Sequence, residues 1–199
     1  MMEEWRIKGY TLEFDDVTHT YLVDGVVVPS VTQMLKRRFS NKYDGIPDGI
    51  MKRASERGTR VHKAIENYCI ANEEDGSEEL RNYKFLAKHY NFKAIMNEMP
   101  IILEKDAHPF CAGRLDLVLN IDGAYAVADI KTTATLDKDY LAYQLNIYRL
   151  ALMQNVDINI TKLYGLHIRE NKRKFVEIPV NERIAWELIE EYESEEMNK

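Results

Sequence analysis

The sequence predicts an α/β fold in which a mixed central β-sheet of four or five strands is flanked by helices. Three observations lead to this prediction. Two runs of strand-forming residues, Arg114–Asn120 and Ala124–Lys131, are joined by a tight turn at Asp122-Gly123. Stretches with helically spaced apolar residues precede and follow this hairpin. Two further strands are expected near the end of the chain.

The Asp122-Gly123 turn also predicts the register of the hairpin. An Asp-Gly pair favours a type I′ two-residue loop, in which Ile121 pairs with Ala124. Asp116 then lies directly opposite Asp129. Two carboxylates about 5 Å apart repel each other by about 3 kcal/mol at an effective dielectric constant of 20, which exceeds the range of about 1 kcal/mol spanned by strand propensity. A divalent cation would reverse this repulsion, and Mg²⁺ or Mn²⁺ prefers such oxygen ligands.

Lys131 is expected on the same face as the two carboxylates, because it lies two residues beyond Asp129, about 7 Å along the strand. The opposite face is apolar and is the predicted core: Leu115, Leu117, Leu119, Ala126, Ala128 and Ile130. An Asp…Asp-x-Lys pattern is a weak motif by itself. From these residues alone, a hairpin with a charged and solvated outer face is the alternative interpretation.

Length and composition are those of an ordinary globular domain. The chain has 199 residues, of which 45% are hydrophobic and 30% are charged, and it is long enough to bury a core. Cys69 and Cys111, far apart in sequence, exclude a disulfide framework and favour a reducing compartment. Because no signal-peptide pattern and no apolar run of about 20 residues is present, we expect a cytoplasmic protein with no membrane partner.

The net charge of −6 argues at first sight against a nucleic-acid partner. However, six Glu residues lie between Arg183 and Lys199, and this acidic segment can lie far from any site. Basic residues gather in Lys36–Arg38 and between Lys52 and Lys63. Phosphate binding depends on the local potential, so the overall charge does not exclude DNA.

The N-terminal segment predicts β-hairpins followed by a short helix. Residues 10–29 are expected to form β-hairpins, with turns near Asp15-Asp16 and Asp24-Gly25. Ser30 is a natural N-cap for a helix over Val31–Arg38. Residues 39–48 read as a loop.

Two helices are predicted before the central hairpin. The first covers Gly49–Ala71, with Gly58 as a candidate break, and carries His62. The second covers Leu80–Glu98 and is ended by Pro100, after which Ile101–Lys105 reads as a strand. Glu104 on this strand is either a third carboxylate for the Asp pair or an edge-strand charge. A helical His, and the neighbouring Arg57, Arg60 and Lys63, are equally compatible with an ordinary solvated helix face.

The elements after the hairpin complete the sheet and its cover. A helix is predicted over Tyr140–Met153, where Gln144 and Tyr148 are i,i+4 neighbours on one face. Strands are predicted over Lys162–Glu170 and Lys174–Val180, and an amphipathic helix over Glu182–Glu193.

With these elements in order, the chain resembles the RecB-like branch of the PD-(D/E)XK nuclease superfamily. The motifs that carry the resemblance are Gly58-Thr59-Arg60-Val61-His62, Gly113-Arg114-Leu115-Asp116, Asp129-Ile130-Lys131-Thr132 and Gln144-x-x-x-Tyr148. The segment Val28–Thr32, followed by a short helix, is also similar to small single-domain members, including phage and bacterial exonucleases and the mitochondrial genome maintenance exonuclease. The resemblance implies a restriction-endonuclease-like core with extra N-terminal β-hairpins.

The resemblance also implies a role for individual residues. Asp116, Asp129, the Ile130 carbonyl and His62 would bind Mg²⁺ or Mn²⁺. Lys131 would orient the attacking water, and Glu104 would contribute through a water molecule. Gln144 and Tyr148 would hold DNA or brace the site, and further candidate substrate-binding residues are Arg57, Arg60 and Thr132.

The chain departs from the family pattern at two points. Leu115 precedes Asp116 where the superfamily name has Pro. The four cysteines of relatives with an iron–sulfur cluster are absent from the sequence, so we expect no such cluster.

We therefore expect one nuclease domain over residues 1–199, with N-terminal hairpins and a short helix in 1–48, a catalytic core in 49–180 and a C-terminal helix in 181–199. The expected activity is a metal-dependent DNA exonuclease that hydrolyses phosphodiester bonds at single-stranded or duplex ends, working with recombination, repair or replication proteins. The alternatives are an endonuclease of the same superfamily and a catalytically silent module that binds nucleic acid or a partner. RNA as substrate, polarity and the number of metal ions are left open.

Overall fold

A mixed central sheet organises the chain, as the sequence predicts. In the computed structural model, which describes residues 2–43 and 45–197, its five strands lie in the order β5-β6-β7-β8-β9. Their bounds are Phe92–Lys105, His108–Ile121, Ala124–Lys131, Ile160–Arg169 and Lys172–Ile178. Only the β7–β8 pair within these described strands is parallel, and helix α4 (Lys138–Asn155) makes the crossover between them.

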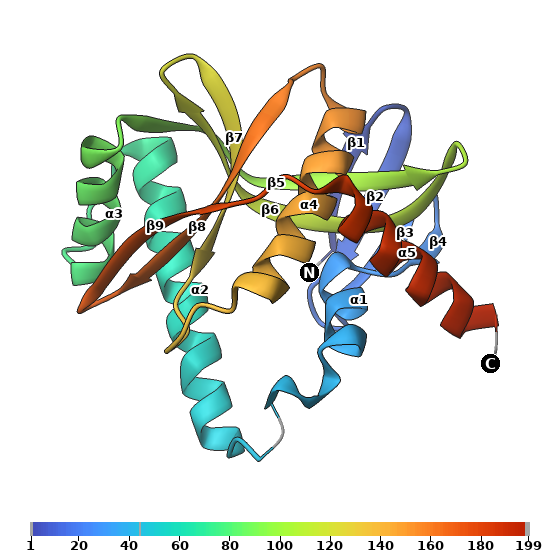
Figure 1. Cartoon of the computed structure of the whole chain (residues 1–199), viewed down its shortest axis with the longest axis horizontal. Helices are drawn as coiled ribbons and strands as arrows, with labels where there is room; N and C mark the ends of the chain where they lie inside the picture. Colours follow the sequence, from blue (N-terminus) through green and yellow to red (C-terminus); the bar gives the residue numbers. More distant parts are fainter. Residues whose placement is uncertain (1, 44, 198–199) are drawn as a thin grey trace.

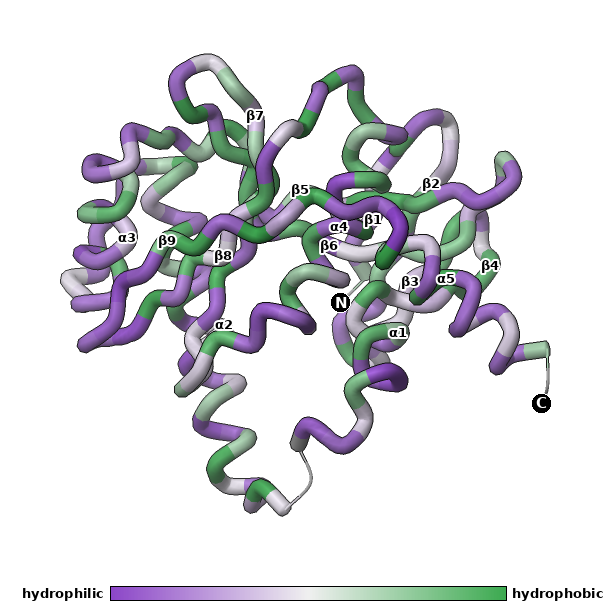
Figure 2. Tube along the Cα trace, in the orientation of Figure 1, coloured by the Kyte–Doolittle hydropathy of each residue, from purple (hydrophilic) through white to green (hydrophobic). Residues whose placement is uncertain are grey.

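Helices cover both faces of this sheet (Figure 1). On one face, α2 (Asp48–Ala71) and α3 (Glu78–His89) pack against side chains such as Leu117, Ala128 and Ile130. On the other, α1 (Val31–Arg38), α4 and α5 (Glu182–Met197) pack against Val118 and Val127. The face of the hairpin that carries Asp129 is therefore not a solvated surface. Figure 2 shows the hydrophobic stretches concentrated along the strands in the middle of the molecule.

A second, antiparallel sheet lies at the N-terminus. Its strands are β1 (Met2–Ile7), β2 (Tyr10–Asp15), β3 (Thr20–Val23) and β4 (Val26–Val28), of which β1 extends the predicted hairpins. Apolar side chains of this sheet pack against Ile102 and Ala112 of β5 and β6. The following helix α1 has the predicted bounds, because Ser30 and Gln33 form a capping box. A 3₁₀ turn, η1, covers Ser40–Tyr43.

The prediction of one long helix over Leu80–Glu98 is wrong. Helix α3 ends at His89, Asn91 takes a left-handed conformation with φ of 50°, and β5 starts at Phe92. Asn tolerates this conformation at a helix end, and it is the local signal for the break. Pro100 lies within β5 and does not end a helix. A proline is tolerated there because β5 is the outer strand of the central sheet. Pairing with the whole of β6 overrides the helical spacing of the segment.

The other predicted elements are confirmed with small shifts at their ends. Helix α2 runs through Gly58 without a break, and α4, β8, β9 and α5 contain or overlap the predicted ranges. At the central turn, Asp122 has φ of 51° and Gly123 has φ of 89°, and Ile121 pairs with Ala124 as predicted. None of the helices in the described residues is both long enough and apolar enough to cross a membrane.

We expect Gly123→Ala to lower the free energy of unfolding by about 1 kcal/mol, because an L-residue with a Cβ atom is strained at this positive φ. Chemical denaturation by urea measures the change. Gly49→Ala is the matched control, since Gly49 lies in helix α2 with open space around its Cα, where Ala is neutral or stabilising. Equal effects of the two substitutions would contradict the role assigned to the turn.

Candidate metal centre

The two aspartates of the central hairpin lie next to each other at the point where the regular β6–β7 pairing ends. The last regular pair is Leu117 with Ala128, so Asp116 and Asp129 occupy the next position along the two strands. There, Asp116 Oδ2 accepts a hydrogen bond from the backbone N–H of Ile130, at 2.6 Å. The Asp116 carboxylate thus takes the place of a backbone carbonyl of β6 as the acceptor for this N–H group.

A third carboxylate, Glu98, completes this row and was not among the predicted site residues. On β5, Asn97 pairs with Leu117 and Met99 pairs with Leu115, so Glu98 lies opposite Asp116. Glu98 has φ of 45°, a left-handed conformation that is rare for a residue with a long side chain. Sequence reasoning missed Glu98 because the segment was assigned to a helix.

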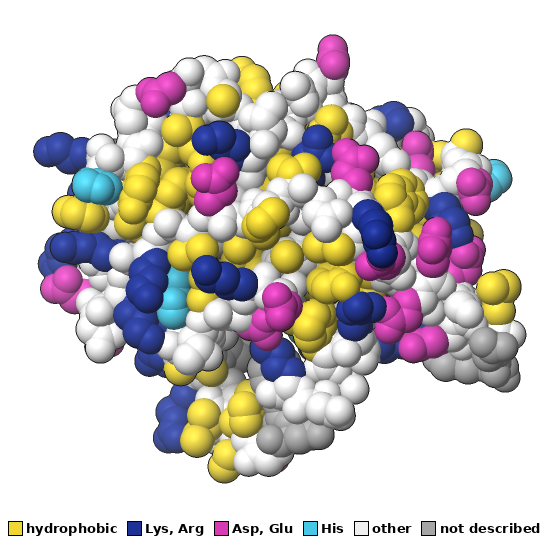
Figure 3. Space-filling view, in the orientation of Figure 1, with side chains coloured by type: hydrophobic (Ala, Val, Ile, Leu, Met, Phe, Trp, Pro, Cys, Tyr) yellow, Lys and Arg dark blue, Asp and Glu magenta, His cyan; other side chains and the backbone are white. Residues whose placement is uncertain are grey.

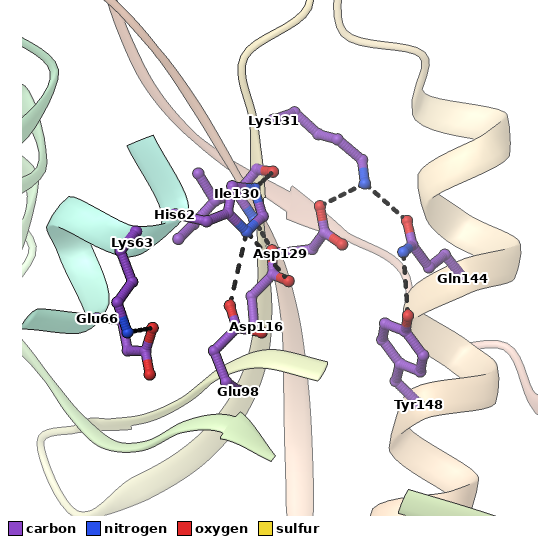
Figure 4. A network of polar contacts seen from close by, with 10 residues as sticks. All are labelled: His62, Lys63, Glu66, Glu98, Asp116, Asp129, Ile130, Lys131, Gln144 and Tyr148. Carbon is purple, nitrogen blue, oxygen red and sulfur yellow. Dashed lines mark hydrogen bonds and ion pairs between the residues drawn. The ribbon is translucent and has the colours of Figure 1, made fainter. Parts of the chain in front are cut away.

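His62 reaches the row of carboxylates from helix α2 (Figure 4). Its Nε2 lies 3.0 Å from the carbonyl oxygen of Ile130 and donates to it. Its Nδ1 lies 3.6 Å from Asp116 Oδ1 and 3.7 Å from Glu98 Oε1. One ligand atom from each of His62, Glu98 and Asp116 lies within 4.8 Å of the other two. The predicted association of His62 with Asp116 and the Ile130 carbonyl is therefore present in the structure.

Lys131 is held between the site and helix α4. Its Nζ lies 2.6 Å from Asp129 Oδ2 and donates to Gln144 Oε1 at 2.8 Å. Gln144 Nε2 in turn donates to the Tyr148 hydroxyl at 3.3 Å. Both α4 side chains are buried, and the ring of Tyr148 lies so close to Gly113 that a Cβ there would be 3.2 Å from it. Of the two roles considered for Gln144 and Tyr148, this geometry favours bracing Lys131.

One buried carboxylate oxygen of this site has an ion-pair partner but, within the part of the chain that the structure describes, no hydrogen bond. The approach of Lys131 to Asp129 Oδ2 lies outside hydrogen-bond geometry, so this buried oxygen has no hydrogen-bond partner among the described residues. Arg57 Nε on α2 and Asn97 Oδ1 on β5 also lack a hydrogen bond among the described residues. A buried carboxylate normally accepts several hydrogen bonds, so Asp129 keeps spare acceptor capacity. Carboxylate and imidazole groups with spare acceptor capacity fit a divalent cation.

The crowding of acidic groups changes their proton affinities. Burial and the negative charge of Asp116 raise the pKa of Asp129 to about 6. Burial also raises the pKa of Asp116, although the positive charges of His62 and Lys131 oppose this. For His62, burial lowers the pKa, but the charges of Asp116, Glu98 and Asp129 outweigh it and raise the pKa to about 9. The imidazolium thus compensates the carboxylates in the metal-free protein.

A cavity of about 370 Å³ opens beside this cluster. It is lined by residues of α2 together with the third carboxylate: Gly58, Thr59, His62, Lys63, Glu66 and Glu98. Lys63 and Glu66 form an ion pair of 3.0 Å along its wall, and Figure 4 shows them on the α2 side of the cluster. The site is therefore open to solvent from the α2 side.

The structure places two predicted residues elsewhere. The Glu104 carboxylate pairs with Lys8 of the N-terminal sheet at 3.3 Å. It lies six residues beyond Glu98, about 20 Å further along the strand. The prediction that Glu104 joins the aspartates is wrong, because the strand starts earlier than expected and brings Glu98 there instead. Arg60 pairs with buried Glu79 at 2.7 Å, which ties α2 to α3.

Arg57 and Thr132 do lie at the site. Arg57 Nη2 donates to the backbone carbonyl of Thr132 at 3.1 Å. Thr132 follows Lys131 directly and is buried, and its Oγ1 lies next to Gly58 of α2. This contact holds α2 against the end of β7, so Arg57 places a guanidinium beside the metal-binding candidates.

Comparison with known proteins adds the following. No family model matches the chain. No curated protein matches it either. Among solved structures, the chain is similar to one described as the crystal structure of SSO0001, with 17% sequence identity and a TM-score of 0.49 over 86% of this chain and 76% of the other.

We expect Asp129→Asn to stabilise the metal-free protein at neutral pH. The folded protein holds the Asp129 proton more tightly than the unfolded chain, so stability falls as the pH rises from the ordinary value of 3.8 through about 6. A shift of this size corresponds to about 3 kcal/mol. The asparagine side chain carries no titrating carboxyl, so the variant does not lose this stability as the pH rises. It should therefore unfold at a higher urea concentration than the wild type at pH 7 in chelator.

At pH 4 the wild type and Asp129→Asn should have nearly equal free energies of unfolding, because Asp129 is then protonated in the folded wild type. A difference between the two proteins that does not change from pH 4 to pH 7 would contradict the charge crowding inferred at this site.

Proposed function

We propose that this protein is a metal-dependent DNA exonuclease with a restriction-endonuclease-like core. The observation that carries the proposal is the cluster of His62, Glu98 and Asp116 beside the buried Asp129–Lys131 pair. Acidic side chains that converge on one point repel each other unless a cation offsets them. The motif resemblance described above supports the same assignment, since the clustered residues are those of its motifs together with Glu98.

The residues proposed to hold Mg²⁺ or Mn²⁺ are Asp116, Asp129, Glu98, His62 and the Ile130 carbonyl. Carboxylate oxygens suit both ions, and the imidazole makes Mn²⁺ the better match. A cation bound in this place lowers the pKa of a water molecule and offsets charge on the phosphoryl oxygens. No Cys lies in the cluster: among the described residues, Cys69 bonds with Tyr83, and Cys111 is buried in the core. The proposal includes no iron–sulfur cluster.

Lys131 is proposed to orient the attacking water and to offset charge on the scissile phosphate. Its ammonium is fixed from two sides, by Asp129 and by the Gln144 amide. The Tyr148 hydroxyl holds that amide in turn. Burial raises the pKa of Tyr148 well above its ordinary value, so this hydroxyl stays neutral in alkaline solution as well.

The substrate is proposed to approach along the cavity beside α2. Lys63 on its wall and the guanidinium of Arg57 near its end offer positive charge to phosphate groups. These are contacts to the backbone of a nucleic acid, which carry no sequence information. This favours an enzyme that acts at ends over one that reads a sequence.

Substitutions at the cluster should separate catalytic from structural carboxylates. We expect Asp129→Ala, Lys131→Ala and Glu98→Gln each to lower the rate of release of nucleotides from end-labelled DNA at least a hundredfold. Loss of one charged group at such a centre costs several kcal/mol of transition-state stabilisation. Glu104→Gln is the matched control on the same strand and should keep wild-type activity, because Glu104 pairs with Lys8.

The assay should use single-stranded DNA, duplex DNA, single-stranded RNA and covalently closed circular DNA, with Mg²⁺, Mn²⁺ or chelator. Cleavage of the circle would favour the endonuclease alternative. Cleavage that persists in both Asp129→Ala and Lys131→Ala would overturn the proposed centre. Absence of cleavage under all these conditions would favour the silent binding module.

Binding of Mn²⁺ should release a proton. At pH 7.5 His62 carries a proton in the metal-free protein, because its pKa is raised to about 9, and ligation through Nδ1 must displace that proton. Calorimetric titrations in two buffers with different ionisation enthalpies should give about one proton released per ion, and the affinity should rise with pH up to about 9. His62→Gln should bind Mn²⁺ more weakly and release no proton. Binding without proton release in the wild type would remove His62 from the proposed ligands.

A further inference from the structure

A continuous chain of aromatic rings connects the surface of the molecule to its core at the α3–β9 flank. Phe85 stacks on His89 with ring centroids 5.5 Å apart and an interplanar angle of 10°. His89 meets Tyr90 edge-on at 4.8 Å, and Tyr90 contacts Phe175 of β9 at 4.6 Å. Phe175 in turn stacks on Tyr164, at 4.2 Å. The inner rings are part of the core, so the outer ones are held in place by it.

The outer rings of this chain are exposed. Phe85 is 43% exposed and Tyr90 is 41% exposed, and His89 is exposed between them. The guanidinium of Arg173 lies over the Phe85 ring, 3.8 Å from its centroid, and donates to Asn82 Oδ1. A large aromatic side chain is ordinarily buried, so a rigid exposed set of three rings marks an interaction surface. We call Phe85, His89, Tyr90 and Arg173 the aromatic flank.

The surroundings of the aromatic flank are basic in a chain of net charge −6. Residues 81–93 contain Arg81, Lys84, Lys88 and Lys93 and no Asp or Glu. Residues 169–174 contain Arg169, Lys172, Arg173 and Lys174 with one acidic residue, Glu170. Figure 3 shows Lys and Arg side chains gathered over α3 and β9, at the left of the view, next to hydrophobic ones. This concentration of charge matches a polyanion.

Part of this positive charge is not neutralised by the protein. Arg81 pairs with Glu78, and Lys84 pairs with Glu74. Lys88, Lys93 and Lys174 form no ion pair with any residue in 2–43 or 45–197. All three are exposed. These ammonium groups are available to an external phosphate.

The aromatic flank combines three rings at the end of α3 with Arg173 of β9, and β9 is the edge strand two strands from β7, which carries Lys131. Lys131 pairs in register with His167 of β8, which pairs with Lys174 of β9. At the usual strand spacing, the backbones of Lys131 and Lys174 are about 10 Å apart. Lys172 also bonds to the carbonyl of Ala134, in the loop that follows Lys131. A polymer bound along β9 is therefore close to the proposed metal centre.

We propose that the aromatic flank is a second binding site that holds a single-stranded nucleic acid outside the metal centre, with unpaired bases stacked on Tyr90 and on the Arg173 guanidinium that covers the Phe85 ring, and with phosphates near Lys88 and Lys174. Stacked aromatics combined with basic side chains bind single strands with little sequence preference. A paired duplex does not offer its base faces to such a surface. This site extends the proposed nuclease function to a class of substrate, the single strand, but its binding does not require cleavage.

Fluorescence anisotropy with a labelled oligo(dT) in chelator tests the proposal, because no cleavage can occur without metal. Phe85→Ala should weaken binding at least about fivefold, since it removes the ring under the Arg173 guanidinium and one stacked base contributes about 1–3 kcal/mol, and Phe85→Trp should keep or improve it. Lys88→Glu should weaken binding and reduce its dependence on salt concentration. An oligo(U) of equal length shows whether the strand is DNA or RNA, and a duplex of equal length should bind more weakly than either.

Matched controls are exposed residues remote in sequence from the aromatic flank. Val17→Ala, at a side chain that is 80% exposed, controls for loss of apolar surface, and Arg183→Glu, on α5, controls for the charge change. Thermal melting verifies that each variant is folded. Wild-type affinity in both Phe85→Ala and Lys88→Glu, or effects no larger than those of the controls, would overturn the proposal.

The binding experiment on the aromatic flank and the cleavage experiment on the metal centre can give independent results. Asp129→Ala should bind oligo(dT) in chelator as the wild type does, because Asp129 is buried and lies on β7, whereas the aromatic flank lies on α3 and β9. Loss of cleavage in Asp129→Ala with unchanged binding in Phe85→Ala would refute the aromatic flank alone. Weakened binding in Phe85→Ala with full cleavage in Asp129→Ala would refute the metal centre alone.

Discussion

Electrostatic repulsion among three carboxylates is the constraint on which this structure depends. Strands β5, β6 and β7 bring Glu98, Asp116 and Asp129 into one row, partly out of contact with water. Positive charge faces the row from two sides, from His62 on α2 and from Lys131 on β7. Helices α2 and α4, which pack on opposite faces of the sheet through apolar side chains, each supply a polar side chain to this row or its lysine, His62 from α2 and Gln144 from α4.

The sequence was sufficient for the parts of the site whose geometry is local. The Asp-Gly turn determines the register of β6 and β7, and with it the position of Asp116 relative to Asp129. The i,i+4 spacing on α4 likewise places Gln144 and Tyr148 on one face, and the structure adds that this face points at Lys131. In both cases a few consecutive residues carry the whole prediction.

Glu98 could not be found in the same way. Its position depends on where α3 ends and on how β5 pairs with β6. That pairing includes a bulge between Ala94 and Met96 and the left-handed backbone of Glu98 itself. The helical spacing of Tyr83, Leu86 and Tyr90 continues by chance to Ile95, and the one local signal against it, Asn91 at the end of α3, is weaker than this apolar pattern. The predicted strand begins at Ile101, nine residues after the true start of β5 at Phe92, so the carboxylate it offers is Glu104 and not Glu98.

The left-handed backbone of Glu98 has a consequence for the evolution of stability in this chain. A glycine at position 98 would adopt φ of 45° without strain and would remove one of the mutually repelling charges. Selection for stability alone would therefore replace this glutamate. Under the proposed function, residue 98 is a position where the protein gives up folding free energy to keep a ligand for the cation. Random libraries screened for thermal resistance should therefore enrich substitutions at this position.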